Sequence, residues 1–166
     1  LDQLKLAFDT KGTVTAATSS PLTDGAAATI ICEENYAKEN NLNILGRIIS
    51  TAVEGCDPDY MGLGPIGASK KALMRADLSI DKIDIFELNE AFASQSLACI
   101  KDLGIDQKKV NIDGGALALG HPLGATGARI TGKAADLLRR ENKKYALSTQ
   151  CIGLGMGIAT VIESVD

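Results

Sequence analysis

The stretch IDIFELNEAFASQSLACIKDLG, residues 83–104, decides the fold class of this 166-residue chain. Its first six residues form a short, mainly apolar run that predicts a strand, and Asn89 ends that run. Residues 90–103 then predict a helix, which Gly104 stops because glycine favours the turn past a helix end. A strand that leads directly into a helix is the building unit of α/β proteins.

The same alternation continues on both sides of this segment. Besides residues 83–88, four runs of apolar or β-branched residues predict strands, at residues 29–32, 45–53, 145–150 and 157–164. Helices are expected between them, and the last two strands are close enough in sequence to pair antiparallel. The chain is therefore expected to be an α/β layered sandwich, with a five-stranded, mixed and mostly parallel sheet and helices on both faces.

Charge and composition argue against several classes of protein. The formal net charge of −4 argues against a general nucleic-acid binder, which needs a basic face. No apolar run approaches the roughly 20 residues that span a bilayer, so no membrane span is expected. The four cysteines (Cys32, Cys56, Cys99 and Cys151) form no C-x-x-C pair, so we expect no metal site, no disulfide framework and a reducing compartment. The chain opens on Leu1 without a methionine, and we expect it to be part of a longer polypeptide.

The single histidine, His121, is a candidate site residue. Glycines surround it, Pro122 fixes the backbone after it, and a predicted helix begins a few residues later. The positive end of a helix disfavours the imidazolium form, and a neutral imidazole can both accept and donate a proton. A lone histidine is more often structural or exposed, but the glycine-rich surroundings favour a site.

Cys151 lies where a predicted strand meets a glycine-rich turn. A cysteine there can act as a nucleophile or as a proton donor and acceptor, and the sequence does not choose between these roles. The backbone N–H groups of Gly153 and Gly155 are unobstructed by side chains and can face a developing oxyanion. The alternative is a small buried cysteine that only packs.

Asn89 and Glu90 lie between a predicted strand and a helix, the region where α/β proteins place their sites. An amide can hold a water molecule in place, but an asparagine there can equally cap the helix, with Glu90 in its first turn. Ser20, in a loop rich in serine and threonine, is a weaker candidate.

Taken together and in order, these segments resemble the C-terminal half of a thiolase, over nearly the whole chain. The resemblance rests mainly on Asn89-Glu90-Ala91-Phe92-Ala93, Gly120-His121-Pro122 and Cys151-Ile152-Gly153. In several details the sequence resembles the 3-ketoacyl-CoA thiolases of fatty-acid β-oxidation. The resemblance implies a thiolase-like layered sandwich half, in which residues 1–24 are a remnant of the preceding loop region and residues 25–166 form the C-terminal domain. It also implies that Asp77 stands where a helix-ending glycine is usual.

The resemblance implies an acyltransferase that cleaves 3-ketoacyl-CoA with coenzyme A and also catalyses the reverse Claisen condensation. His121 would activate a cysteine of the N-terminal half and bind the thioester oxygen, while Asn89 would position a water molecule. Cys151 would move the proton of the CoA thiol or of acetyl-CoA, and the N–H of Gly153 would serve a second oxyanion hole. Ser20 would contact the pantetheine arm.

The implied partners are acyl-CoA, coenzyme A as co-substrate without a bound cofactor, and the missing N-terminal half that carries the reactive cysteine. A homodimer or homotetramer, or a subunit of a β-oxidation multienzyme, is expected, in the cytoplasm of a bacterium or an organelle matrix of a eukaryote. The isolated chain is expected to be inactive. Two alternatives stay open: a biosynthetic acetoacetyl-CoA thiolase (acetyl-CoA acetyltransferase) and a non-catalytic thiolase-like module that binds acyl-CoA or lipid.

Overall fold

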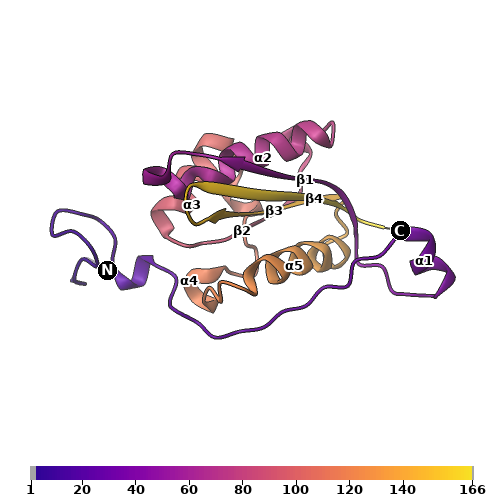
Figure 1. Ribbon diagram of the computed structural model, residues 1–166, viewed down its shortest axis with the longest axis horizontal. Helices are drawn as coiled ribbons and strands as arrows, with labels where there is room; N and C mark the ends of the chain where they lie inside the picture. Colours follow the sequence, from indigo (N-terminus) through magenta and orange to yellow (C-terminus); the bar gives the residue numbers. More distant parts are fainter. Residues whose placement is uncertain (1–2, 166) are drawn as a thin grey trace.

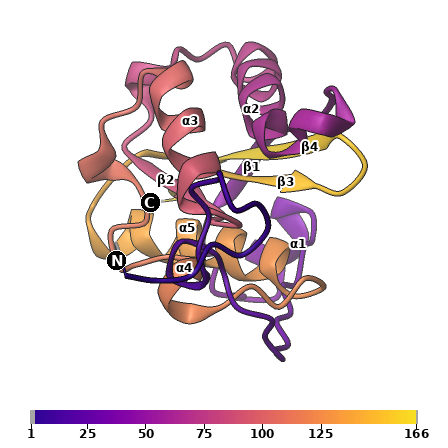
Figure 2. The same ribbon diagram turned by 90° about the vertical axis from the view of Figure 1, so that its left-hand side faces the viewer.

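The computed structural model describes residues 3–165. They form three layers, in which one sheet lies between two layers of helices (Figure 1). Helices α2 (Gly64–Arg75) and α3 (Ala93–Leu103) cover one face of the sheet, and α5 (Thr126–Arg140) covers the other. The view turned by 90° separates the same layers (Figure 2). The predicted α/β sandwich with helices on both faces is confirmed.

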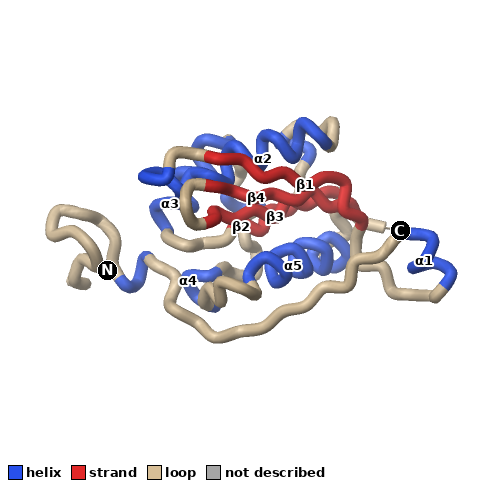
Figure 3. Tube along the Cα trace, viewed as in Figure 1, coloured by secondary structure: helices blue, strands red, loops and turns tan. Residues whose placement is uncertain are grey.

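The sheet has four strands in the order β1-β4-β3-β2 (Figure 3), namely β1 (Arg47–Gly55), β2 (Ile85–Leu88), β3 (Tyr145–Ile152) and β4 (Met156–Glu163). Strand β4 pairs antiparallel with both β1 and β3, whereas β2 and β3 pair in parallel. Strands β1, β2 and β3 therefore run in one direction and β4 runs against them. The mixed sheet is confirmed, and so is the antiparallel pairing of the last two strands. The expectation of a mostly parallel sheet is wrong, because two of the three strand pairings are antiparallel.

The predicted fifth strand, residues 29–32, is wrong. These residues form an extended loop, in which the side chains of Ile30 and Ile31 are 92% and 73% exposed. The loop runs along the outer side of α5, so the helix lies between this segment and the sheet (Figure 1). An apolar run becomes a strand only where its backbone reaches a free strand edge, and α5 prevents that here. Outside the four strands, Val110 forms a single parallel bridge with Phe86.

Two apolar clusters hold the layers together, one on each face of the sheet. Because successive side chains of a strand point to opposite faces, Ile85 packs toward α5 and Phe86 packs toward α2. The cluster under α2 is completed mainly by Ala68, Ala72, Leu73, Leu147 and Val161, and the cluster under α5 by Ala134, Leu137, Leu138, Ala146 and Ile162.

The first turn of α2 lies directly on the beginning of β4. A side chain on Gly64 would overlap the backbone of Met156, and one on Gly157 would overlap the backbone of Gly64. Only glycine permits this approach of one backbone to another. The contact places the start of α2 at the edge of the sheet where β1, β2 and β3 end, which is where α/β folds place their sites.

Short elements complete the described part of the chain. Helix α1 (Glu34–Glu39) is held to the sheet by Arg47, whose guanidinium bonds Glu34 at 2.9 Å and Glu163 at 3.1 Å. Helix α4 (Ala116–Leu119) precedes the turn that contains His121. No helix in the described residues is both long and apolar enough to cross a membrane. Within residues 3–165, four 3-10 helices span Ala16–Thr18, Pro58–Leu63, Ile80–Lys82 and Gln107–Lys109.

Asp77, just past the end of α2, has a φ of 52° and an exposed side chain. Glycine adopts this left-handed conformation without steric cost, whereas a Cβ atom makes it unfavourable and aspartate tolerates it only in part. We expect Asp77→Gly to raise the free energy of unfolding by up to about 1 kcal/mol. Asp77→Ala, the matched control, should lower it. Urea unfolding of the three proteins checks this, and equal stabilities of the Gly and Ala variants would contradict it.

Candidate active site

Asn89 and His121 meet at the carboxyl end of β2. The amide Nδ2 of Asn89 lies 3.3 Å from Nε2 of the His121 ring. The Asn89 side chain is buried, and its backbone N–H donates to the carbonyl of Thr149 on β3 at 2.9 Å. Helix α3 begins only at Ala93, three residues later than the sequence suggested, so Asn89 is not its cap. The sheet itself therefore aims the Asn89 amide at the imidazole.

The second ring nitrogen of His121 contacts Thr126. Nδ1 lies 2.7 Å from the hydroxyl oxygen of Thr126, and that hydroxyl donates to the carbonyl of Pro122 at 3.0 Å. Burial, and secondarily the positive charge of Arg129, lower the pKa of His121 below its usual value. The ring is therefore neutral at pH 7 and can accept a proton. Sequence reasoning missed Thr126, whose signal is its position as the first helical residue after the glycine-rich turn.

The loop that begins at Ser20 lies against both of these segments. The backbone N–H and the hydroxyl of Ser20 both donate to the carbonyl of Ala91, at 3.0 and 3.1 Å. Further along, Thr23 packs where a side chain on Gly120 would overlap it, and Gly120 has a φ of 98° that suits glycine. The structure thus places the loop that contains Ser20 against the segments that carry Asn89 and His121.

Cys151 lies at the same edge of the sheet but on the neighbouring strand. It is the second-last residue of β3, two residues past Thr149, the residue that pairs with the end of β2. Burial, and to a smaller degree the nearby Cys56, raise the pKa of the Cys151 thiol. It is therefore protonated at pH 7 and suited to donate a proton. No hydrogen bond joins Cys151 to His121 in residues 3–165.

Gly153 lies in the exposed turn between β3 and β4. Nothing stands within 4 Å of the position that a Cβ atom would take, so the space beside this turn is open. The next two residues, Leu154 and Gly155, have φ values of 70° and 85°. A substrate could approach the backbone of Gly153 without displacing a side chain.

Glu90 braces the loop that follows Asn89 instead of facing the ring. Its carboxylate accepts from the side-chain amide of Asn111 and from the backbone N–H of Leu117, each at 3.0 Å. Asn111 in turn bonds both backbone groups of Leu88, at 2.8 and 2.9 Å. Glu90 lies outside α3, so the alternative reading of it as a first-turn acid of that helix is wrong, and its contacts fix the end of β2.

A buried acid, Glu87, lies on β2 two residues before Asn89. Its side chain is 2% exposed, and burial raises its pKa to about 7 although the positive charges of Arg129 and Lys133 oppose the shift. Oxygens of Glu87, Asn89 and Gln150 are buried without a hydrogen-bond partner in the described part of the chain. Sequence reasoning missed Glu87, although an acid inside an apolar strand was the available signal.

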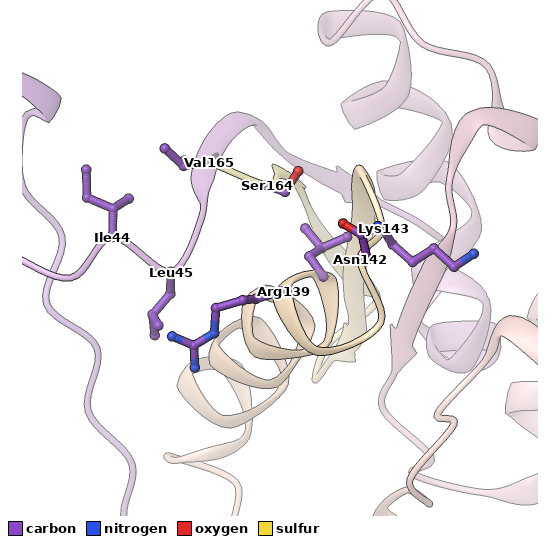
Figure 4. Close-up of a pocket in the computed structure, with 8 residues that line it drawn as sticks. Ile44, Leu45, Arg139, Asn142, Lys143, Ser164 and Val165 are labelled. Atoms are coloured by element: carbon purple, nitrogen blue, oxygen red, sulfur yellow. The ribbon is translucent and has the colours of Figure 1, made fainter.

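The described residues also form cavities away from His121. One of about 120 Å³ opens beside the last turn of α5, lined by Leu45, Leu138, Asn142 and Ser164 among others (Figure 4). The 15 residues of α5 separate it from the Thr126 end by roughly 20 Å, at about 1.5 Å per residue.

Within residues 3–165, no group of three or more His, Cys, Asp and Glu side chains could hold a metal ion.

Comparison with known proteins identifies the family to which this chain belongs. The family model of the thiolase C-terminal domain matches residues 42–164, and that of the thiolase N-terminal domain matches residues 1–35. The chain belongs to the thiolase family.

Within that family, the chain is similar to bacterial 3-ketoacyl-CoA thiolases. It is 56% identical over 169 aligned residues to the 3-ketoacyl-CoA thiolase of Cronobacter sakazakii and 55% identical over 167 to that of Vibrio vulnificus. The alignments cover 99% and 98% of this chain but only 44% and 43% of the relatives. The chain therefore spans less than half the length of the curated relatives it matches.

Two solved structures are also similar to this chain. Human mitochondrial 3-ketoacyl-CoA thiolase in complex with CoA superposes with a TM-score of 0.96 at 48% identity. The acetyl-CoA acetyltransferase of Bacillus anthracis superposes equally well, at 43% identity. Both matches cover 99% of this chain and 42% of the solved chain.

The buried Glu87 predicts how stability depends on pH. Between about pH 4.5 and 7 the folded chain keeps the Glu87 proton while the unfolded chain loses it, so stability falls as pH rises and levels off above pH 7. Glu87→Gln removes this loss, and we expect the variant to gain about 3 kcal/mol relative to wild type between pH 4 and pH 8. Urea unfolding at both pH values measures it. Parallel stability curves for the two proteins would show that Glu87 ionises normally.

Proposed function

We propose that this chain is the C-terminal part of an acyltransferase that cleaves 3-ketoacyl-CoA with coenzyme A to give acetyl-CoA and a shortened acyl-CoA, and that also catalyses the reverse Claisen condensation. The observation that carries the proposal is the neutral His121 ring, held between Asn89 and α5 at the carboxyl ends of the strands. The likeness to 3-ketoacyl-CoA thiolases supports the choice of substrate.

In this proposal His121 acts as the general base for acyl transfer. Its Nε2 atom takes the proton of a cysteine supplied by chain outside these 166 residues, and the thiolate attacks the 3-keto carbon of the substrate. The bond between C2 and C3 breaks, and the electron pair moves onto the acetyl-CoA fragment as an enolate. The Nε2–H group formed in the first step then donates a hydrogen bond to the thioester oxygen of that enolate.

Cys151 supplies and removes the second proton. Its thiol is protonated at pH 7, so it can protonate C2 of the enolate and release acetyl-CoA. The Cys151 thiolate then takes the proton of incoming CoA, and the CoA thiolate removes the acyl group from the nucleophilic cysteine, which regains its proton from His121. The N–H of Gly153, in the open turn after β3, would stabilise the tetrahedral oxyanion of these acyl transfers.

Asn89 and Ser20 would position the reactants. The buried Asn89 oxygen lacks a hydrogen-bond partner among the described residues, which suits an amide that orients a water molecule beside the thioester oxygen. Two hydrogen bonds to the carbonyl of Ala91 hold Ser20 beside the segment that carries Asn89, and we place the pantetheine arm of CoA against Ser20. Coenzyme A is a co-substrate in this scheme and no cofactor is required.

We further propose that residues 1–24 end a preceding loop region and residues 25–166 form the C-terminal domain. The N-terminal family model extends further, to residue 35. The cysteine nucleophile would belong to an N-terminal domain, so the isolated chain should lack turnover. A homodimer or homotetramer acting in β-oxidation completes the proposal.

The two site residues of the acylation step should differ in effect. In the complete enzyme we expect His121→Ala to slow acylation of the nucleophilic cysteine by about 10³-fold or more, and Asn89→Ala by about 10²-fold, because a base contributes more than one positioned water. Mass spectrometry of the acyl-enzyme after rapid quenching measures both rates.

Lys143→Ala, in the exposed turn three residues past the far end of α5, is the control for general damage. Equal and small losses in the two site variants would contradict the roles assigned to His121 and Asn89. Absence of any acyl-enzyme in the wild-type protein would instead favour a non-catalytic module that binds acyl-CoA.

A biosynthetic acetoacetyl-CoA thiolase is the second candidate, because the Bacillus anthracis acetyl-CoA acetyltransferase superposes as closely as the 3-ketoacyl-CoA thiolase does. We expect kcat/KM of the complete enzyme to be higher for a 3-ketoacyl-CoA with a medium or long chain than for acetoacetyl-CoA, since the sequence is more similar to the former class. Thiolysis assays on a chain-length series measure this. A preference confined to acetoacetyl-CoA would favour the second candidate.

A further inference from the structure

We propose that Thr126 fixes the tautomer of His121, so that the proton of the neutral ring resides on Nδ1 and the lone pair on Nε2. Thr126 would be a positioning residue, which acts on the reaction only through His121. The catalytic use of this lone pair rests on the function proposed above, whereas the tautomer can be measured independently of it.

The hydrogen of the Thr126 hydroxyl decides the direction of the contact. A hydroxyl has one hydrogen to donate, and Thr126 donates it to the carbonyl of Pro122 at 3.0 Å. Toward the His121 ring, 2.7 Å away, the same oxygen can therefore only accept. The group that donates to it is Nδ1–H.

The opposite side of the ring agrees. The Asn89 atom that faces Nε2 is Nδ2, a donor, at 3.3 Å, and a donor requires a lone pair on its partner. The other tautomer would place two N–H groups against each other at Nε2 and two acceptors against each other at Nδ1. One tautomer thus satisfies both contacts of the ring, and the other satisfies neither.

The contact is rigid because Thr126 is anchored. Its side chain is fully buried, so water does not compete for its oxygen. It is the first residue of α5, a helix whose later turns pack Leu137 and Leu138 into the core. The orientation of the imidazole is therefore set by the packing of a whole helix.

This arrangement prepares the ring for the proposed step. The base needs a lone pair on the side where the reacting thiol arrives, and the Nδ1–H tautomer provides one at Nε2, where the long 3.3 Å contact with Asn89 can give way to the thiol. When Nε2 takes the proton, Nδ1–H still donates to the threonine oxygen, so the positive ring keeps an acceptor. Serine would serve equally at position 126, whereas isosteric valine would not.

Nuclear magnetic resonance of the chain labelled with ¹⁵N-histidine tests the tautomer, and all signals belong to His121 because it is the only histidine. At pH 8, where the ring is neutral, we expect wild type to show a protonated Nδ1 and an unprotonated Nε2. In Thr126→Val the population should shift toward protonated Nε2, and in Thr126→Ser it should return to the wild-type state.

Thr131→Val is the matched control. Thr131 lies on the same helix and bonds Ser148 at 3.2 Å instead of the ring, so this variant should leave the His121 signals unchanged. A wild-type spectrum with protonated Nε2 would overturn the proposal by itself, even if Thr126→Val failed to fold. So would a Thr126→Val spectrum identical to that of wild type.

The acylation rate of the complete enzyme links the tautomer to function. We expect Thr126→Val to lower it by roughly tenfold to a hundredfold and Thr126→Ser to recover most of the loss, a smaller effect than removal of the base itself. A shifted tautomer with an unchanged rate would overturn the base role of His121, and with it the proposed function, while leaving the hydrogen-bond assignment intact.

Discussion

The parallel pairing of β2 with β3 is the constraint on which the site depends. It sets Leu88 beside Thr149, and the next N–H, that of Asn89, continues the ladder to the Thr149 carbonyl. Because side chains alternate along a strand, a slip of one residue would turn Asn89 away from His121 and bury a different set of side chains. Four residues of β2, all buried, thus fix the register of the sheet and the direction of the amide.

Helix α5 fixes the orientation of the His121 ring, as β2 fixes the direction of the Asn89 amide. Its beginning holds the imidazole through Thr126, and its later turns fill the core beneath the sheet. On the outer side, Asp113 is clamped by Arg140 at 2.6 and 2.7 Å and by Lys133, which holds the turn before α4 against the helix. The two halves of the candidate site therefore reach each other from elements that are separately anchored.

The sequence predicted most of the elements because their signals are local. An apolar run followed by helical spacing identified β2 and α3, and glycines around His121 and after Cys151 marked the turns that expose them. The failure at residues 29–32 has a tertiary cause, since nothing in that run says that α5 will stand between it and the sheet. Thr126 and Glu87 carry weaker sequence signals, a threonine at the start of a helix and an acid inside an apolar strand. Only the fold shows that Thr126 meets the His121 ring and that Glu87 lies in the core.

The contact of Gly64 with Gly157 has a consequence for how this fold tolerates change. Where side chains separate two elements, a substitution can be absorbed when those side chains repack and the elements shift by a fraction of an ångström. At this point backbone touches backbone, so no side chain is available to yield. We therefore expect substitutions beneath α2 to shift the far end of that helix more than its near end, which this contact holds beside the turn after Cys151. The end of α2 that can shift is therefore the end that lies away from the candidate site.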